Sequence, residues 1–252
     1  MKTSTVNLCI VILSLCTAAC SHNSQFKKAS PQVSAATNMQ LAIEYMKLGK
    51  LASSRDFIER ALRENPSSAD VQMTAGIVYE RLNDMPKAAR AYENAFRQGK
   101  GDPNVENTYA GFLCRTGKSA AGEKLFTEVA ASPLYQTPEV ALLNAGVCVH
   151  EAGDVVDAER YFNKALDVHP NMAEALLQLG NIAFDRGDAA QARDMVQRSL
   201  AVNPPTSEIL WLGFRAERKL GDATSAAAYA RRVQAEFPNS AQARMLRSGI
   251  ER

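Results

Sequence analysis

The sequence lacks the clusters of reactive side chains that catalytic and metal sites require. It has only three histidines, His22, His150 and His169, and they are far apart in the chain. No second histidine follows His150 and Glu151 at the spacing of a zinc-protease helix. Residues 111–119 look like a phosphate-binding loop, but the segment has one residue too many between its glycines and no strand signal before it. We therefore expect a protein that is not an enzyme and that uses no metal, cofactor or small-molecule substrate.

The chain also lacks an excess of charge of either sign. It has 29 Lys and Arg residues against 27 Asp and Glu residues. Binding to a nucleic-acid backbone depends on a strong positive field, so we expect no nucleic-acid partner. Strand signals are absent as well, and the fold is therefore expected to be helical throughout.

The apolar run near the start of the chain is too short to cross a membrane. Val6–Leu15 has ten residues, whereas a membrane-spanning helix needs roughly 20. The run lies between the basic Lys2 and a group of small residues that ends at Cys20, which is the pattern of a secretory signal. Small residues directly before a cysteine resemble the cleavage box of bacterial lipoproteins. We predict that residues 1–19 are a lipoprotein signal peptide and that Cys20 carries the lipid; plain secretion with cleavage nearby is the alternative.

The residues after Cys20 indicate where such a lipoprotein would be held. In Gram-negative lipoproteins an aspartate directly after the lipidated cysteine tends to retain the protein in the inner membrane, and Ser21 stands there instead. The resemblance implies an outer-membrane lipoprotein that is anchored by its lipid and faces the periplasm. Residues 20–34 are polar and show no apolar periodicity, so we expect a lipidated flexible tether.

Six turn residues recur at a nearly constant step through the rest of the chain. The intervals between them are 34, 34, 36, 34 and 34 residues, and two extra residues near 132–138 account for the longer step. A period of about 34 residues is typical of tetratricopeptide helix–turn–helix repeats. The six turn residues are Gly49, Asn83, Gly117, Gly153, Gly187 and Gly221.

Small residues stand at fixed distances on both sides of each turn, which indicates closely paired helices. The position seven residues before the turn is small in every repeat except the sixth, where it is Phe214. We predict an all-α, right-handed solenoid of about six repeats over residues 35–240, followed by a C-terminal tail over residues 241–252. The small residues are Ala42, Gly76, Ala110, Gly146 and Gly180 before the turns, and Ser54, Ala88, Gly122, Ala158, Ala192 and Ala226 after them.

Two cysteines remain once the signal peptide and the lipidated residue are set aside. Cys114 and Cys148 fall on the first helices of repeats three and four, near the same height. First helices of neighbouring repeats pack side by side, and the oxidising periplasm favours a bridge between such a pair. We predict a Cys114–Cys148 disulfide; two buried thiols that act as small apolar side chains are the alternative.

The concave face of a tetratricopeptide array is formed mainly by the first helix of each repeat. In repeats one and two the concave positions hold Met39, Ile43, Met46, Met73 and Ile77. Flexible methionine side chains suit an adaptable peptide site, and an apolar patch of this kind marks partner surfaces. We predict that these five residues form a partner-binding groove. The alternative is that the tether or a neighbouring repeat covers them.

Repeat three contains a stretch that the general repeat pattern does not explain. Residues 107–117 read Asn-Thr-Tyr-Ala-Gly-Phe-Leu-Cys-Arg-Thr-Gly. This resembles the Asn-Asn-Tyr-Gly-x-Phe-Leu-Cys run of the PilF/PilW pilotins of type IV pilus systems, with departures at Thr108 and Ala110. The Ser-Pro-Leu-Tyr of residues 132–135 and the Asn-Ala-Gly-Val-Cys of residues 144–148 continue the match in the same order.

The resemblance implies a pilotin. Proteins of that family help the pilus secretin to reach the outer membrane and to assemble into its multimeric ring. The expected partner is therefore the secretin subunit, held by the apolar groove, while the lipid at Cys20 carries the complex to the outer membrane. The alternative is a tetratricopeptide lipoprotein that serves as an adaptor in another envelope assembly, such as outer-membrane protein insertion or cell-wall synthesis.

Overall fold

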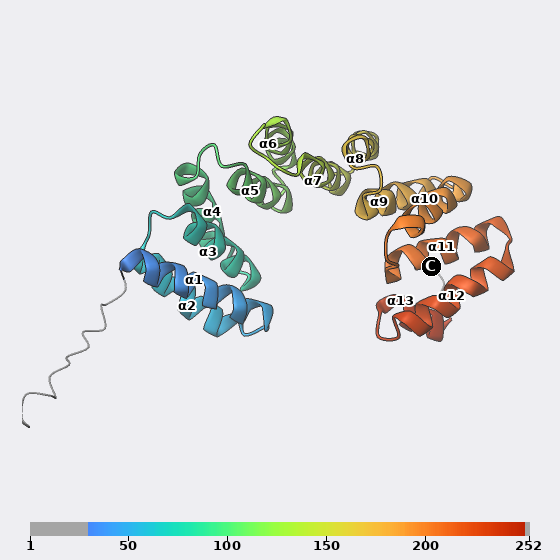
Figure 1. The fold of residues 1–252 in the computed structure, drawn as a ribbon, viewed down its shortest axis with the longest axis horizontal. Helices are drawn as coiled ribbons and strands as arrows, with labels where there is room; N and C mark the ends of the chain where they lie inside the picture. Colours follow the sequence, from blue (N-terminus) through green and yellow to red (C-terminus); the bar gives the residue numbers. More distant parts are fainter. Residues whose placement is uncertain (1–29, 250–252) are drawn as a thin grey trace, which may run out of the picture.

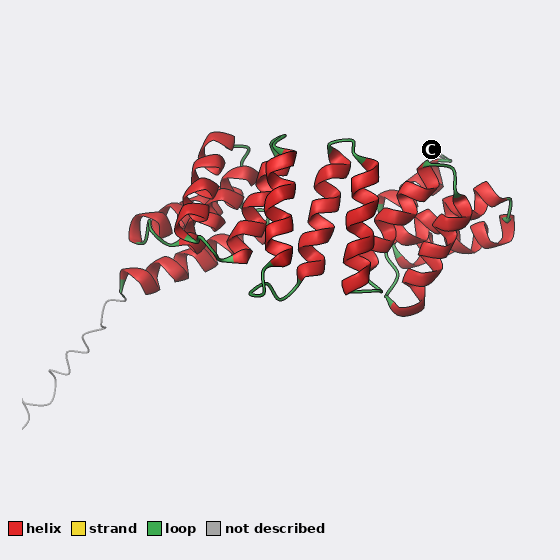
Figure 2. Ribbon diagram, turned by 90° about the horizontal axis from the view of Figure 1, so that it is seen from above, coloured by secondary structure: helices red, strands yellow, loops and turns green. Residues whose placement is uncertain are grey.

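The computed structural model describes residues 30–249, and every regular element in this range is a helix (Figure 2). Consecutive helices form pairs, and the pairs follow one another along a curved solenoid (Figure 1). No helix in the described range is both long and apolar enough to span a membrane. The helices are α1 (Pro31–Lys47), α2 (Leu51–Glu64), α3 (Ala69–Arg81), α4 (Met85–Gln98), α5 (Pro103–Arg115), α6 (Ser119–Ala131), α7 (Pro138–Glu151), α8 (Val155–Val168), α9 (Ala173–Asp185), α10 (Ala189–Val202), α11 (Ser207–Leu220), α12 (Ala223–Glu236) and α13 (Ala241–Ser248).

The residue that turns the chain between the two helices of each pair has a left-handed backbone. Glycine tolerates this conformation because it has no Cβ. Asn83 has a φ of 59° and is the only non-glycine residue of the described range with a positive φ; asparagine is among the few residues that tolerate it. The predicted turn positions are therefore confirmed. The glycine turns have φ values of 70° at Gly49, 79° at Gly117, 94° at Gly153, 95° at Gly187 and 84° at Gly221.

Small residues before the turns let paired helices approach closely, as predicted. A Cβ on Gly76 would lie 2.8 Å from the ring of Tyr92, and a Cβ on Gly146 would lie 2.5 Å from the ring of Phe162. Both rings are buried in the interior. Because an interior is packed to crystal-like density, a larger residue at either position would push the two helices apart.

Repeat six meets the same packing requirement with a shift of one residue. Phe214 holds the position that is small in the other repeats, and the small residue, Gly213, directly precedes it. A Cβ on Gly213 would lie 2.9 Å from the ring of Tyr229. Phe214 is buried, and its ring packs at a tilt against Trp211 with the ring centroids 5.1 Å apart. The exception in the sequence pattern is therefore local and leaves the helix pair intact.

The solenoid begins earlier than residue 35. Helix α1 starts at Pro31, and the Ser30 hydroxyl accepts a hydrogen bond from the Val33 N–H at 3.3 Å. A proline at the first helical position after a serine cap is a strong helix start. Ser34 also donates to the Glu64 carboxylate of α2 at 2.8 Å. The prediction that the tether reaches residue 34 was therefore wrong for its last four residues. The signal peptide, Cys20 and the rest of the tether lie outside the described residues.

The end of the chain is also more regular than predicted. Residues 241–248 form α13, which begins where the Ser240 hydroxyl accepts from the Ala243 N–H at 3.0 Å. Ala243 is fully buried, and Leu246 packs against the core residues of α11 and α12. The prediction of a tail over residues 241–252 was wrong for this part. The last helix pair of a solenoid has an open apolar face, and a capping helix covers it.

Candidate functional site

The five residues of the predicted groove lie on α1 and α3 and are all half-buried. Met39, Met46 and Ile77 pack against the core that α1 to α4 enclose. Ile43 and Met73 are half-buried without belonging to that core cluster. We call these five residues the N-terminal strip. Its side chains hold part of the fold together and still leave apolar surface open to solvent.

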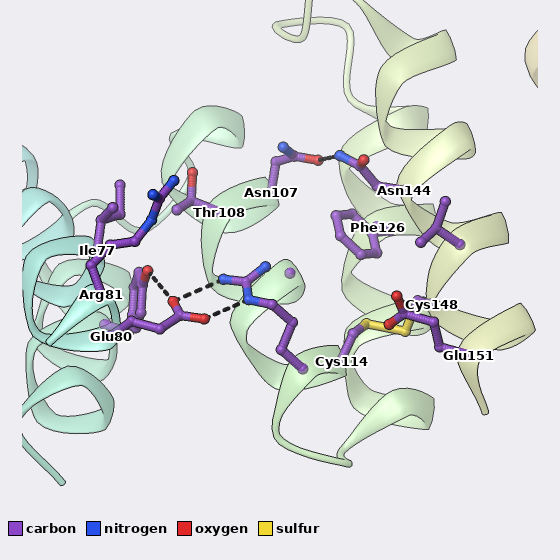
Figure 3. A pocket seen from close by; sticks show the side chains of 14 residues that line it. Ile77, Glu80, Arg81, Asn107, Thr108, Cys114, Phe126, Asn144, Cys148 and Glu151 are labelled. Atoms are coloured by element: carbon purple, nitrogen blue, oxygen red, sulfur yellow. Dashed lines mark hydrogen bonds and ion pairs between the residues drawn. A yellow bond between two sulfur atoms is a disulfide. The ribbon is translucent and has the colours of Figure 1, made fainter. Parts of the chain in front are cut away.

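A second feature of the concave face lies further along the solenoid. A pocket of about 700 Å³ is lined mainly by α3, α5 and α7, which Figure 1 shows on the inner side of the arc. Tyr92 of α4 and Phe126 of α6 complete its lining. We call it the central pocket (Figure 3). Ile77 is the one residue that it shares with the N-terminal strip. Its lining residues include Arg81, Asn107, Asn144, Val147 and Glu151.

An ion pair closes one wall of the central pocket and joins repeats two and three. Arg115 of α5 donates two hydrogen bonds to Glu80 of α3, from Nε to Oε1 at 2.6 Å and from Nη2 to Oε2 at 3.0 Å. The Tyr92 hydroxyl of α4 donates to Oε2 of Glu80 at 2.8 Å. The Glu80 carboxylate is thus held by three donors, and two parallel bonds from one guanidinium fix its orientation.

These contacts change the ionisation of each partner. Burial favours the neutral form of Glu80, but the hydrogen bonds from Arg115 and Tyr92 outweigh it and lower the pKa of the carboxyl group. Burial and the hydrogen bond to Glu80 raise the pKa of the Tyr92 phenol, so it stays a donor. The hydrogen bond to Glu80 raises the pKa of the Arg115 guanidinium. Near neutral pH the network is therefore a fully charged ion pair with a neutral phenol.

The remaining polar groups of the central pocket are less fully paired. Asn144 donates to the side-chain oxygen of Asn107 at 3.4 Å, a long bond that leaves the other amide donors of both residues available. Arg81 on α3 and Glu151 on α7 stand on opposite sides of the pocket (Figure 3), and both are exposed. Neither forms a salt bridge with another residue between 30 and 249.

The two predicted bridge cysteines also line this pocket. The structure places the sulfur atoms of Cys114 and Cys148 2.00 Å apart, with the two Cα atoms 5.4 Å apart. A Cβ on Gly122 would lie 2.3 Å from the Cys114 sulfur, so glycine is required where the other repeats have serine or alanine. Formation of the disulfide in the cell stays a prediction.

The central pocket and the N-terminal strip offer different chemical groups to a ligand. The described part of the chain has no group of three or more His, Cys, Asp or Glu side chains that could hold a metal ion. Among the residues of that part, the central pocket offers one free cation, one free anion and amide groups between them. The N-terminal strip offers apolar side chains. Such surfaces bind other molecules through complementary shape and charge.

Comparison with protein families identifies the repeats. Tetratricopeptide-repeat models match residues 39–103, 149–217 and 209–240, and together they cover more than half of the chain. The chain is a tetratricopeptide-repeat protein. This confirms the predicted repeat type and the all-α solenoid.

Two named proteins are similar to this chain. The "Type IV pilus assembly protein PilF" of Pseudomonas aeruginosa is 24% identical over 133 residues, which are 53% of this chain and 53% of that protein. The alignment thus spans about half of the length of PilF. The crystal structure of PilW, described as a widely conserved type IV pilus biogenesis factor, has a TM-score of 0.71 and 27% identity, and the match covers 86% of this chain and 98% of PilW.

A structure of Pseudomonas aeruginosa PilF supports the same architecture. Its TM-score is 0.68 at 20% identity, with 88% of this chain and 100% of that chain covered. At this identity the match shows the shared fold. The described residues therefore share their fold with PilW and PilF.

Proposed function

We propose that this protein is a pilotin-type outer-membrane lipoprotein that binds the type IV pilus secretin and promotes its localisation and multimerisation. The observation that carries the proposal is the match to PilW over 86% of the chain, with the sequence similarity to PilF beside it. These similarities support a role in type IV pilus biogenesis. The secretin as partner, the lipid at Cys20 and the outer membrane are the finer parts of the proposal.

The proposed lipid anchor at Cys20 would lie close to the solenoid. If Cys20 carries the lipid and α1 begins at Pro31, ten residues separate them. At most roughly 3.4 Å per residue, they span no more than about 35 Å. The solenoid would therefore work close to the inner surface of the outer membrane, where a secretin subunit must insert.

The N-terminal strip is the surface that would hold the secretin. Its half-buried methionine and isoleucine side chains suit an apolar segment of the partner, such as one face of an amphipathic helix. Burial of the exposed remainder contributes roughly 25 cal/mol per Å² of apolar area. Since no bond is made or broken, assembly is promoted only if the protein binds one state of the subunit better than another.

The proposal is tested by one substitution in the strip and one matched control. Ile43→Glu places a charge in the strip at a residue outside the core cluster, so helicity should be retained. Val156→Glu is the control, because Val156 is 77% exposed in the first turn of α8, where an acidic residue is favourable. Tagged full-length variants are pulled down from membranes, and the secretin is detected in the eluate.

We expect the unchanged protein and Val156→Glu to retain the secretin and Ile43→Glu to lose it. Secretin bound equally by all three variants would show that the strip is not the binding surface. Failure of the unchanged protein to retain any secretin would contradict the pilotin proposal and favour an adaptor in another envelope assembly.

A further inference from the structure

The central pocket has charge of opposite sign on its two sides, and this arrangement selects an occupant. We propose that it binds an extended polypeptide segment of a partner protein, with an acidic side chain at Arg81 and a basic side chain at Glu151. The proposal rests on the coarser part of the proposed function, namely that the concave face binds a polypeptide. It does not depend on the identity of that polypeptide.

Some of the charged side chains that line the pocket are already paired with one another, so a ligand meets only the remaining ones. Arg115 is already neutralised by Glu80 through two hydrogen bonds, and Tyr92 adds a third donor to the same carboxylate. Arg81 and Glu151 are exposed and form no salt bridge with the described residues. Within residues 30–249, a ligand therefore meets one free cation on α3 and one free anion on α7 of the pocket.

This pair of charges disfavours ligands of a single sign. A uniformly anionic chain would be attracted by Arg81 and repelled by Glu151. A uniformly cationic chain would be repelled by Arg81 and attracted by Glu151. Like charges brought together at an interface are costly. A polypeptide that carries both signs at a suitable separation satisfies both sides at once.

The helix spacing sets that separation. Helices α3, α5 and α7 are the first helices of three successive repeats, and packed helices lie roughly 8–10 Å apart. The outer two are then separated by about 16–20 Å. An extended chain rises about 3.3 Å per residue, so about five or six residues bridge the two charges.

The middle of the pocket suits the main chain of such a segment. Asn107 and Asn144 share one long hydrogen bond and keep further amide donors and acceptor lone pairs. Gly111 of α5 also lines the pocket and has no side chain to fill it. Extended peptide groups need partners for both N–H and C=O, and side-chain amides supply both.

Selection of peptides from a random library displayed on phage tests the proposal and requires no identified partner. The bait is the chain from residue 21, which omits the predicted signal peptide and Cys20, compared with two double variants that have the same net charge. Arg81→Glu with Glu151→Lys reverses the two pocket charges. Arg90→Glu with Glu93→Lys reverses two exposed charges on α4, outside the pocket lining, and is the control.

We expect peptides selected on the unchanged protein to carry an acidic and a basic residue about five or six positions apart. A synthetic peptide from this pool should bind the pocket variant about fivefold to tenfold more weakly, as two partly exposed ion pairs allow, and the control variant unchanged. The same peptide with its two charges exchanged should recover its affinity for the pocket variant. Circular dichroism checks that all variants fold.

Three results would overturn the proposal. The first is no enriched peptide, or enriched peptides without the charge pair. The second is equal binding to the pocket and control variants. The third is a dimer in sedimentation experiments that only the pocket variant loses, since the occupant would then be a second copy of this chain. Each of these results leaves secretin retention through the N-terminal strip as a separate measurement.

Discussion

The N-terminal strip and the central pocket occupy equivalent positions of the repeat and have opposite chemistry. Met39 and Met73 stand ten residues before their turns, and in repeat three that position holds Asn107. Four residues later, repeats one and two have Ile43 and Ile77, whereas repeat three has Gly111, which lines the central pocket. The backbone is the same, so the side chains alone convert an apolar surface into a polar one. One scaffold therefore presents two surfaces of different chemistry.

The two regions also differ in what supports them. Met39, Met46 and Ile77 of the strip pack directly on the core of α1 to α4. The wall of the central pocket depends on the ion pair between Glu80 and Arg115 and on the adjacent sulfur atoms of Cys114 and Cys148. Because each repeat of a solenoid contacts mainly its neighbours, damage on α6 or α7 should leave the part of the strip on α1 largely intact, although the two regions share Ile77 of α3. Substitutions in one region, with measurements on both, test how far the two regions are independent.

The largest effect is expected from Phe126→Ala. Phe126 of α6 lines the central pocket and is 2% exposed. Loss of a buried phenylalanine leaves a cavity that costs about 3–5 kcal/mol. Urea unfolding should show this loss, while secretin retention at low temperature should remain because the strip lies on α1 and α3, in repeats one and two, and Phe126 belongs to repeat three. Parallel loss of secretin retention in a variant that is still folded would contradict the independence of the two regions.

A smaller effect is expected from the double variant Cys114→Ala with Cys148→Ala. The two cysteines are 34 residues apart in sequence, and closing such a loop stabilises the folded state by up to about 4 kcal/mol in the chain-entropy model. Urea unfolding with and without reductant should show that reductant destabilises only the unchanged protein. Alkylation of both cysteines in unreduced protein, seen by mass spectrometry, would show that the disulfide does not form.

The smallest effect is expected from Glu80→Gln. The Arg115 side chain is 49% exposed, and solvent screening limits the loss to about 1 kcal/mol near neutral pH. The pKa of Glu80 is lowered from its ordinary value of 4.5. The carboxylate therefore stabilises the fold above that value, and the contribution is lost as the pH falls through the lower folded pKa.

The pH dependence of unfolding isolates this contribution. The unchanged protein should lose more stability between neutral pH and the acid range than Glu80→Gln does. The variant Glu93→Lys, with its change on the outer helix α4, should keep the full acid dependence of Glu80. Equal pH profiles for the unchanged protein and Glu80→Gln would show that the ion pair does not stabilise the wall of the central pocket.

The sequence predicted the parts of the fold that follow from a repeated physical requirement. A left-handed turn needs glycine or asparagine, and two closely packed helices need a small residue such as Gly76 or Gly146. Both requirements recur in every repeat, so residues that meet them appear at a regular spacing in the sequence. Cys114 and Cys148 could be paired for the same reason, because they are one repeat apart.

Features that occur once were harder to predict. The start of α1 has a local signal in Ser30 and Pro31, which does not recur with the repeat period. Helix α13 has only eight residues, too few to show a clear period. The wall of the central pocket joins Glu80 to Arg115, which are 35 residues apart and therefore occupy different positions of the repeat. A pair of this kind appears only when the packing of α3 against α5 is known.

The most direct test of the account is the amount of secretin multimer in cells, measured on gels. Four strains are compared: one with the unchanged protein, one without it, and two with Ile43→Glu or Val156→Glu in its place. The account predicts multimers with the unchanged protein and with Val156→Glu, and their loss in the other two strains. Equal amounts of multimer in the strain that lacks the protein would contradict a role in secretin assembly.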